Sequence, residues 1–231
     1  MYQILSPLVN GITFLINGLY HFTVQAHMGS YGLAIILFTI LLKIVLYPLT
    51  LKQMKSMYMM KELGPKIKEI QDKYKKKDPQ KMQQKVMEVY KEHNVNPMAG
   101  CVPLLIQMPI LLALFQSLRT FVYSDVNHAK FLWITNLSDI NNEFFILPGL
   151  AAITTYLQTK MTTNTADQTQ KMMLYMMPVM IAWFSMQVPA GLALYWVTFN
   201  IMGIAQQYLI NKQTSAMKEA ITEGAGNRKD R

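Results

Sequence analysis

Five long apolar stretches constrain this chain of 231 residues more than any other feature of its sequence. A helix needs about 20 largely apolar residues, with a range of about 17–25, to cross the hydrocarbon core of a bilayer. Each stretch reaches that range with only single polar interruptions. We therefore predict an all-α integral membrane protein with five transmembrane helices, at residues 30–51, 98–118, 144–161, 172–188 and 190–210.

The composition agrees with this class and disfavours soluble ones. Hydrophobic residues make up 52% of the chain and charged residues 15%, against roughly 25% charged in an average soluble domain. One soluble core of this size cannot bury so much apolar sequence. The net charge of +9 is not that of a nucleic-acid binder, whose basic residues would cover a polar surface. The single cysteine excludes a disulfide framework.

The positions of the basic residues predict the orientation of the spans. Of the 22 Lys and Arg residues, 12 lie between the first two spans, two lie around the link after the third, and five lie in the tail. The other side carries only Arg119 and Lys130. Because cytoplasmic loops are enriched in Lys and Arg, we predict a cytoplasmic C-terminus. The predicted connections are a charged cytoplasmic segment (52–97), an external loop (119–143), a short cytoplasmic loop (162–171) and a basic cytoplasmic tail (211–231).

The N-terminal segment has an amphipathic pattern and no Lys, Arg, Asp or Glu before residue 27. A helix with a polar stripe opposite an apolar one lies in the membrane interface more readily than across the bilayer. We predict an external interfacial helix over 1–27, with a sixth span as the alternative. The polar stripe is Gln3, Ser6, Asn10, Thr13, Asn17 and Tyr20, and the apolar one is Leu5, Leu8, Ile12, Leu15 and Leu19.

The charged segment 52–97 is predicted to form a helical hairpin. Pro79 disfavours helix at the residue before it, which places a turn at residues 75–79. Two interpretations stay open: a solvated link between spans, or a mobile basic docking arm near anionic lipid, ribosome or nascent chain. The two apolar seams are Leu63, Ile67, Ile70 and Tyr74 in the first helix, and Met82, Val86 and Val89 in the second.

Lys43 is the one charge that topology does not explain. It lies nine residues before Lys52, about 13 Å inside the cytoplasmic edge at 1.5 Å per residue. An ammonium at this depth costs roughly 2.5–3.5 kcal/mol, and an unpaired cation inside a membrane is a functional-site candidate by default. None of the five predicted spans contains Asp or Glu. Either water reaches Lys43 or the amine is held neutral.

Polar side chains on four predicted spans can enclose a hydrophilic groove around Lys43. Thr39, Lys43 and Tyr47 share one helix face, and polar residues also recur on the third and fifth spans. Interhelical hydrogen bonding, worth roughly 0.6 kcal/mol each, is the alternative for the hydroxyls and amides, and for Gln107 both interpretations stay open. The candidate groove residues are Lys43, Thr39, Tyr47, Gln107, Gln158, Trp196 and Asn200.

The stretch from Asn96 to Ile110, NPMAGCVPLLIQMPI, closely resembles the signature at the start of the second core helix of the YidC membrane insertases. The resemblance covers nearly the whole chain. It implies one positive charge in the first core span, in a groove open to cytoplasm and lipid and closed outside. The matching position is Lys43, where the family usually has arginine. Gln158 and Trp196 match the family's polar groove residues, and Gln107 lies within the signature.

This resemblance implies a membrane protein insertase or chaperone of the bacterial plasma membrane. Nascent membrane proteins, especially those with acidic external tails, would enter the groove and pass sideways into the lipid bilayer without nucleotide hydrolysis. The hairpin and tail are implicated in receiving substrate, ribosome or signal recognition machinery, and the Sec translocon is a further candidate partner. The short bacterial form, which this chain is similar to, typically begins as a lipoprotein precursor, so we expect any export signal to have been removed.

Two other function classes fit the sequence less well than an insertase does. An ion channel or small-solute transporter lacks support because no charged ring repeats at several depths and no inverted pair of broken helices is found. A membrane enzyme lacks support because His21, His27, His93 and His128 are scattered and show no metal-ligand spacing. We expect Cys101 to serve in packing. We therefore predict no catalytic residue, no metal and no cofactor.

Overall fold

The computed structural model describes residues 2–74, 77–93, 95–96, 102–140, 145–163 and 168–226, and every regular element within these ranges is a helix. The prediction of an all-α chain is confirmed. Residues 97–101 of the signature stretch 96–110, including Cys101, lie outside the described residues. The helices are α1 (Tyr2–Gln25), α2 (Tyr31–Val45), α3 (Tyr47–Glu62), α4 (Gly64–Tyr74), α5 (Pro79–Glu92), α6 (Val102–Arg119), the 3₁₀ helix η2 (Val126–Ala129), α7 (Ile146–Thr162), α8 (Gln168–Ser185) and α9 (Ala190–Gly226).

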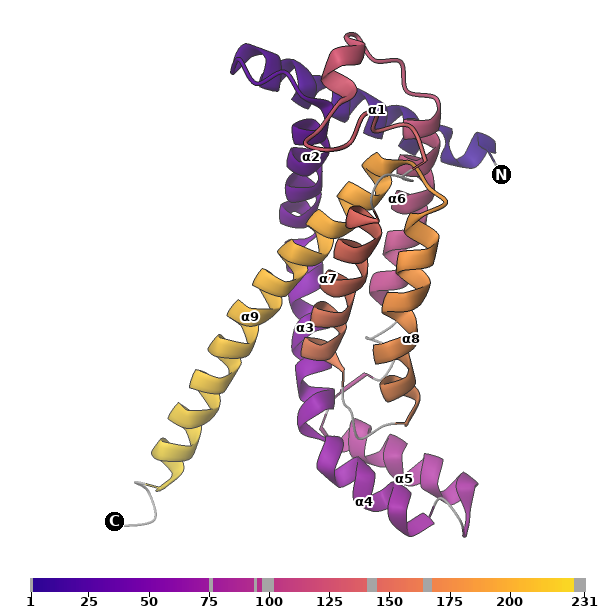
Figure 1. Cartoon of the computed structure of the whole chain (residues 1–231). Helices are drawn as coiled ribbons and strands as arrows, with labels where there is room; N and C mark the ends of the chain where they lie inside the picture. The colour runs from indigo at the N-terminus through magenta and orange to yellow at the C-terminus, as the bar shows by residue number, and fades with distance from the viewer. Residues whose placement is uncertain are drawn as a thin grey trace.

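Helices α2, α3, α6, α7, α8 and α9 form an elongated bundle (Figure 1). Helix α7 packs on both α8 and α9, and α9 also packs on α2. Helix α1 crosses one end of the bundle, where it contacts α2 and α6, and the α4–α5 pair lies at the opposite end (Figure 1). The two ends of the bundle are therefore covered by elements of different kinds, one largely uncharged and one rich in lysine.

A sharp bend interrupts the first apolar stretch. Helices α2 and α3 meet at 69° around Leu46. Pro48 lies in the first turn of α3, and a proline has no N–H and clashes with the carbonyl four residues before it. The N–H of Leu46 instead donates to Leu42 O and Ile44 O, which ends α2. The stretch 30–51, predicted as one span, is thus two helices with different directions.

No single helix among the described residues is both long and apolar enough to cross a membrane. Helices α2 and α3 satisfy that criterion only when taken together, across their bend. Two shorter apolar helical segments are Leu105–Arg119 and Lys171–Ser185. The five spans stay a prediction.

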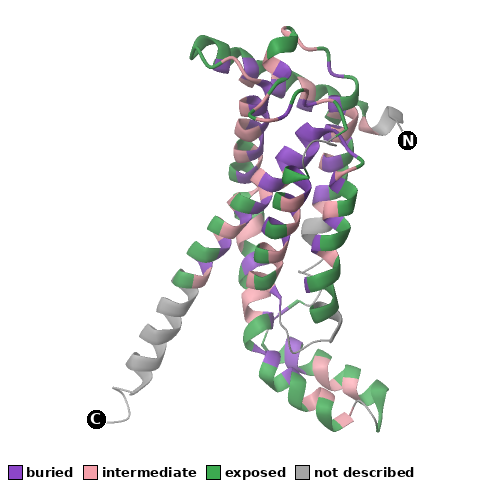
Figure 2. Cartoon of the chain, in the orientation of Figure 1, coloured by how far each residue is buried: buried purple, intermediate pink, exposed green. Residues whose placement is uncertain are grey.

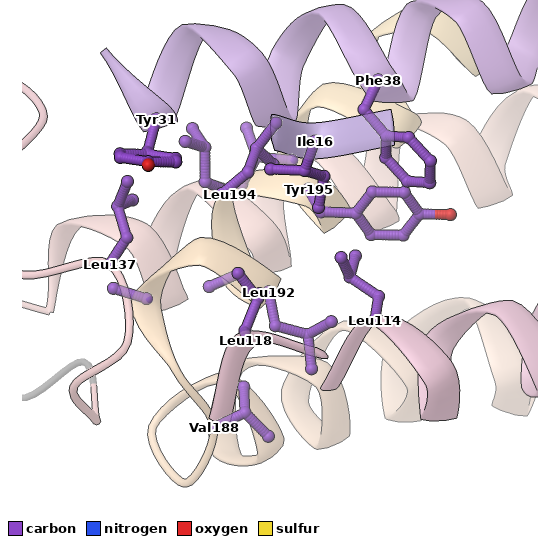
Figure 3. Packing of buried hydrophobic residues seen from close by; sticks show 14 of the residues in the cluster. Ile16, Tyr31, Phe38, Leu114, Leu118, Leu137, Val188, Leu192, Leu194 and Tyr195 are labelled. Atoms are coloured by element: carbon purple, nitrogen blue, oxygen red, sulfur yellow. The ribbon is translucent and has the colours of Figure 1, made fainter. Parts of the chain in front are cut away.

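The hydrophobic core lies in the half of the bundle next to α1, where buried residues gather in Figure 2. Figure 3 shows this cluster, which runs from Tyr31 to the paired rings of Phe38 and Tyr195. The loop after α6 closes that end, because Ser138 Oγ donates to Leu118 O at 2.8 Å. The backbone N–H of Gly191 also donates to Leu137 O at 2.8 Å. The centre of this half of the bundle is therefore a packed apolar core.

Helix α1 presents different faces to the bundle and to its surroundings. Ile12, Ile16 and Tyr20 are buried against the bundle, whereas Phe14 is 77% exposed and Phe22 is 61% exposed. The sequence pattern placed Tyr20 in the polar stripe, but its ring stacks on Tyr31 with centroids 3.8 Å apart. Its hydroxyl lies 2.9 Å from His128 Nδ1, which satisfies the polar end. The interfacial position of α1 stays a prediction.

Helices α4 and α5 pack side by side as a short hairpin (Figure 1). The turn ends at Asp78, whose side chain accepts from Lys81 N at 2.9 Å and caps α5 just before Pro79. The charged side chains face solvent, and exposed pairs such as Lys85–Glu88 contribute only about 0–1 kcal/mol each. Burial therefore holds the hairpin through one cluster, formed by Met60, Leu63, Ile67, Val89, Tyr90 and Val95.

The C-terminal helix is longer than the sequence predicted. Residues 211–226, predicted as a polar tail, continue α9 to Gly226, well beyond the bundle (Figure 1). No proline lies between Ala190 and Gly226, and residues 216–222 (AMKEAIT) are mostly strong helix formers. A helix can continue past the last residue of its apolar pattern when no helix-breaking residue follows.

We predict that Ile67→Ala opens the hairpin selectively. Ile67 is only 3% exposed within its cluster, and truncating a buried isoleucine to alanine costs about 2–5 kcal/mol. Hydrogen exchange of the α4 and α5 amides is expected to accelerate, with α7 and α9 unaffected. Glu69→Ala, two residues away on the exposed face, is the control, and equal acceleration in both variants would show that this cluster does not hold the hairpin.

Candidate functional site

A polar cavity lies on the hairpin side of the hydrophobic core. Its volume is about 200 Å³, and its walls come from α2, α3, α6, α7 and α9. The contributing parts are the first turns of α3 and α6 and the last turns of α2 and α7. The lining residues are Lys43, Leu46, Leu49, Thr50, Gln53, Met54, Met57, Ile106, Gln107, Gln158, Thr159, Thr162, Phe199 and Gln207.

Lys43 is the charged residue of this cavity. Its side chain is 3% exposed, and its Nζ lies 3.4 Å from the centroid of the Phe199 ring. A desolvated cation on an aromatic face gains about 2 kcal/mol, which offsets part of its burial. An ammonium carries three N–H donors, and no described residue gives it an ion pair or a hydrogen bond. Its acceptors must come from what enters the cavity.

A hydrogen-bonded group of side chains joins α7 to α9 beside Lys43. The Trp196 indole N–H donates to Thr155 Oγ1 at 3.1 Å. The Asn200 amide lies between the threonine hydroxyls and Gln158, and its nitrogen donates to Gln158 Oε1 at 2.6 Å when it faces that residue. In this orientation the Asn200 oxygen lies 2.8 Å from Thr155 Oγ1. Gln158 is thereby held with its amide at the cavity wall.

Gly203 is required for this arrangement. A Cβ at position 203 would lie 2.5 Å from Gln158 Nε2 and 3.3 Å from Lys43 Nζ. Any residue other than glycine would therefore displace the Gln158 amide from α9. The polar ends of Lys43 and Gln158 meet over Gly203, where α9 has no side chain.

Tyr195 marks the boundary between the dry core and the cavity. Its ring lies in the core beside Phe38, and its hydroxyl points away from the cluster (Figure 3). That hydroxyl accepts a hydrogen bond from Gln107 Nε2 at 2.7 Å, so Gln107 is fixed where the polar lining begins. This contact agrees with the hydrogen-bonding interpretation of Gln107, and the side chain also lines the cavity.

Two buried polar atoms of the lining have no partner within the described part of the chain. They are Gln53 Nε2 and Gln207 Oε1. Buried polar groups usually find a protein or water partner, and a water needs only about 10–15 Å³ of such space. The cavity is large enough for several waters, and its lining favours water or a polar chain over an apolar ligand.

The structure brings together only part of the predicted groove set. Lys43, Gln107 and Gln158 line the cavity. Trp196 and Asn200 do not line it: Asn200 bonds to Gln158, and Trp196 bonds to Thr155. The other two predicted residues do not line it. Thr39 is fully buried and donates to Ile35 O at 2.7 Å, and Tyr47 is 41% exposed.

The bend at Leu46 explains the position of Tyr47. The spacing from Lys43 to Tyr47 places both on one face only if the helix is straight, and the helix changes direction by 69° between them. Residues farther along α3, notably Gln53, take the place expected of Tyr47 in the cavity wall.

Sequence reasoning missed three contributors: Gln53, Phe199 and Gly203. Gln53 lies in the segment assigned to the cytoplasmic hairpin, and Phe199 looks like one more lipid-facing aromatic residue. Gly203 had a usable signal, because an isolated glycine inside an apolar helix costs about 1 kcal/mol against alanine and implies a packing reason.

The chemistry available here is that of a binding site. The lining supplies an ammonium, amides and hydroxyls, and within the described ranges no three residues among His, Cys, Asp and Glu cluster as metal ligands. Such groups can bind a carboxylate and hydrogen-bond a peptide backbone.

Comparison with known proteins gives consistent results. The family model described as 60Kd inner membrane protein matches residues 23–218. A membrane protein insertase YidC of Fusobacterium nucleatum is 41% identical over 92% of this chain and 99% of its own length. The YidC of Caldanaerobacter subterraneus is 40% identical over 84% of this chain and 92% of its own length.

Longer relatives match through one part of their length. The YidC of Helicobacter pylori strain J99 is 40% identical over 95% of this chain, which spans only 39% of that protein. A crystal structure of an active YidC insertase with its first transmembrane domain resolved aligns with a TM-score of 0.71 and 31% identity. That match covers 87% of this chain and 46% of the other.

We predict that Gly203→Ala leaves the protein about 1 kcal/mol less stable than Gly149→Ala, the net worth of one hydrogen bond, because a Cβ at position 203 pushes Gln158 away from Asn200. Both variants share the gain of about 1 kcal/mol that alanine brings inside a helix. Thermal unfolding in detergent measures this. Gly149→Ala in α7 is the matched control, since a Cβ there meets no atom within 4 Å.

A second background identifies the cause of the change. In a Gln158→Ala background, Gly203→Ala and Gly149→Ala are expected to have equal effects on stability, because the displaced amide is absent. A full loss of stability in that background would assign the effect to general crowding of α9.

Proposed function

The chain belongs to the YidC family of membrane protein insertases, and from this premise we propose that it inserts nascent membrane proteins into the bacterial plasma membrane. One observation carries the proposal: Lys43, buried in a polar cavity, has no acceptor for its ammonium among the described residues. The acidic and polar segments that flank a substrate's transmembrane helix supply such acceptors.

The bundle would cross the membrane with α1 and the 120–140 loop outside and the α4–α5 hairpin in the cytoplasm. Arg119 and Lys130 are the basic residues at the α1 end, whereas the hairpin end carries 12 of the 22, as the positive-inside bias requires. In this orientation five spans cross the bilayer, the first through the bent pair α2 and α3. The cavity is then a groove on the cytoplasmic side.

The dry core beyond Tyr195 makes this groove one-sided. Beyond Tyr195, packed aliphatic and aromatic side chains occupy the centre of the outer half of the bundle (Figure 3). A substrate tail would be admitted from the cytoplasm to about the depth of Lys43 without opening a path for ions. This packing also argues against an ion channel or small-solute transporter, which needs a polar path through the whole bundle.

Attraction within the groove would be electrostatic and brief. At an effective dielectric constant near 20 and about 4 Å, one carboxylate and the ammonium attract by roughly 4 kcal/mol before desolvation. Gln158 and Gln53 would exchange hydrogen bonds with the entering backbone, which lowers the cost of removing it from water. No covalent bond is made, and nucleotide hydrolysis is not needed for this exchange.

Release would proceed sideways along apolar outer faces. Ile153 of α7 and Ile201 of α9 are 58% and 52% exposed, and similar side chains flank them. Lipid tails are as apolar as these surfaces, so a substrate helix gains little by staying on the protein. It would pass into the bilayer once its polar tail has crossed.

The hairpin and the basic tail are the proposed receiving elements. Lys66, Lys68 and Lys73 of α4 are exposed, as a surface that meets ribosome, signal recognition machinery or anionic lipid would require. The Sec translocon is proposed as a partner only from family membership.

We predict that Lys43→Ala slows insertion of single-span substrates with acidic tails by roughly tenfold, which corresponds to about 1.4 kcal/mol of the barrier, whereas Lys43→Arg retains most activity because it keeps the charge. Purified protein in liposomes and a protease-protection assay measure insertion. Lys52→Ala, which removes an exposed charge, is the control.

Substrate charge separates the possible mechanisms. Neutral-tailed substrates are expected to be less sensitive to Lys43→Ala than acidic-tailed ones. Equal loss in the Ala and Arg variants, or none in either, would refute the charge mechanism. Steady ion flux without insertion would instead support a channel.

We also predict opposite accessibility of the two ends of the bundle. In a Cys101→Ala background, Lys130→Cys should react with a membrane-impermeant maleimide in intact cells, while Lys68→Cys should react only after permeabilisation. Both positions are exposed, so reactivity reports sidedness. The reverse pattern would invert the proposed topology.

A further inference from the structure

A second cavity lies between the first half of α1 and the last turns of α6. Its volume is about 410 Å³, within the roughly 300–1,000 Å³ of small-molecule sites. It is distant in the fold from the Lys43 groove, because it borders α1 at the other end of the bundle (Figure 1). Nothing in the proposed insertion mechanism uses it.

The walls of this cleft are apolar and its rim is polar. Leu5 and Val9 of α1 face Leu112 and Phe115 of α6 across it. The positions from Leu112 through Phe115 to Arg119 follow one face of α6 at helical spacing, so the apolar wall leads directly to Arg119. An amphiphile of matching length would find apolar contacts inside and a cation at the mouth.

Arg119 is the basic group of this cleft. Its guanidinium carbon lies 5.4 Å from the centroid of the Phe115 ring, and no carboxylate of the described residues pairs with it. A guanidinium offers a planar fork of donors that matches phosphate oxygens in pairs. Its stacking on Phe115 holds that fork beside the apolar wall.

We propose that this cleft binds one anionic phospholipid of the outer leaflet, with its phosphate on Arg119 and an acyl chain along Leu112 and Val9. Charge complementarity supports the head group, and the apolar walls support the chain. The exposed Phe14 and Phe22 of α1 place the cleft at the level of the lipid rather than in water. An acidic peptide would leave these apolar walls without a matching partner.

Bound lipid would fasten α1 to the bundle. Near the cleft, a hydrogen bond joins the two helices between Thr13 Oγ1 and Ser117 Oγ, which lie 2.7 Å apart. A lipid between them fills the cleft that their side chains leave. The inference depends on the proposed orientation in the membrane and is independent of insertion activity, so Lys43→Ala should leave lipid binding unchanged.

The test is lipid binding to the full-length protein in detergent, followed by native mass spectrometry with phosphatidylglycerol and phosphatidylcholine. One phosphatidylglycerol should bind roughly tenfold more tightly than phosphatidylcholine, the gain expected from one charge-assisted contact. Arg119→Gln should abolish that preference. Lys130→Gln, which removes the other basic residue of the predicted external loop, should keep it. Thermal unfolding of each variant verifies that it is folded.

A second pair of variants tests the apolar wall. Leu112→Trp fills the cleft and should weaken binding of both lipids, whereas Leu105→Trp, two turns away on α6 and 68% exposed, should not. Glycerol 3-phosphate should fail to displace the lipid, because it has no acyl chain.

Several results would overturn the proposal. Equal loss in Arg119→Gln and Lys130→Gln would mean diffuse surface attraction, and unchanged binding in Leu112→Trp would place the lipid elsewhere. Displacement by glycerol 3-phosphate would identify a free-phosphate site. Displacement by a soluble acidic peptide would identify a peptide site.

Discussion

The burial of one ammonium among apolar helix segments that contain no Asp or Glu is the constraint on which the rest of this structure depends. Lys43 is nearly inaccessible, and no carboxylate lies in any of the apolar segments around it. The chain meets the resulting cost with an aromatic face, Phe199, on one side and a polar cavity on the other. Glycine at position 203 leaves open the space beside Lys43 Nζ and Gln158 Nε2 that a side chain would occupy.

The bundle is accordingly divided into two halves with different physical properties. One half is a packed apolar core that the loop after α6 covers. The other half contains a polar cavity in which two buried polar atoms have no hydrogen-bond partner among the described residues. Tyr195 belongs to both, with its ring in the core and its hydroxyl on Gln107. A bilayer protein with this division can hold a hydrophilic segment at half depth while it remains sealed.

The sequence predicted the parts that depend on composition and periodicity. The all-α class, the isolation of Lys43 and the selection of Gln107 and Gln158, which line the cavity, followed from which residues are polar in apolar stretches. The sequence-based prediction was wrong where the position of a side chain depends on a single bend of the backbone. Pro48 was visible, but a proline early in a helix is compatible with either a start or a kink, and only the bend decides whether Tyr47 or Gln53 faces the cavity.

The joint at Leu46 also makes α3 a lever. Helix α3 has 16 residues and is about 24 Å long at 1.5 Å per residue. Its near end forms a wall of the polar cavity, and its far end carries the hairpin. A tilt of about 10° at the joint moves that far end by about 4 Å over this length. In the proposed mechanism, a force applied at the hairpin would act through α3 on the wall of the cavity, and docking would be coupled to admission.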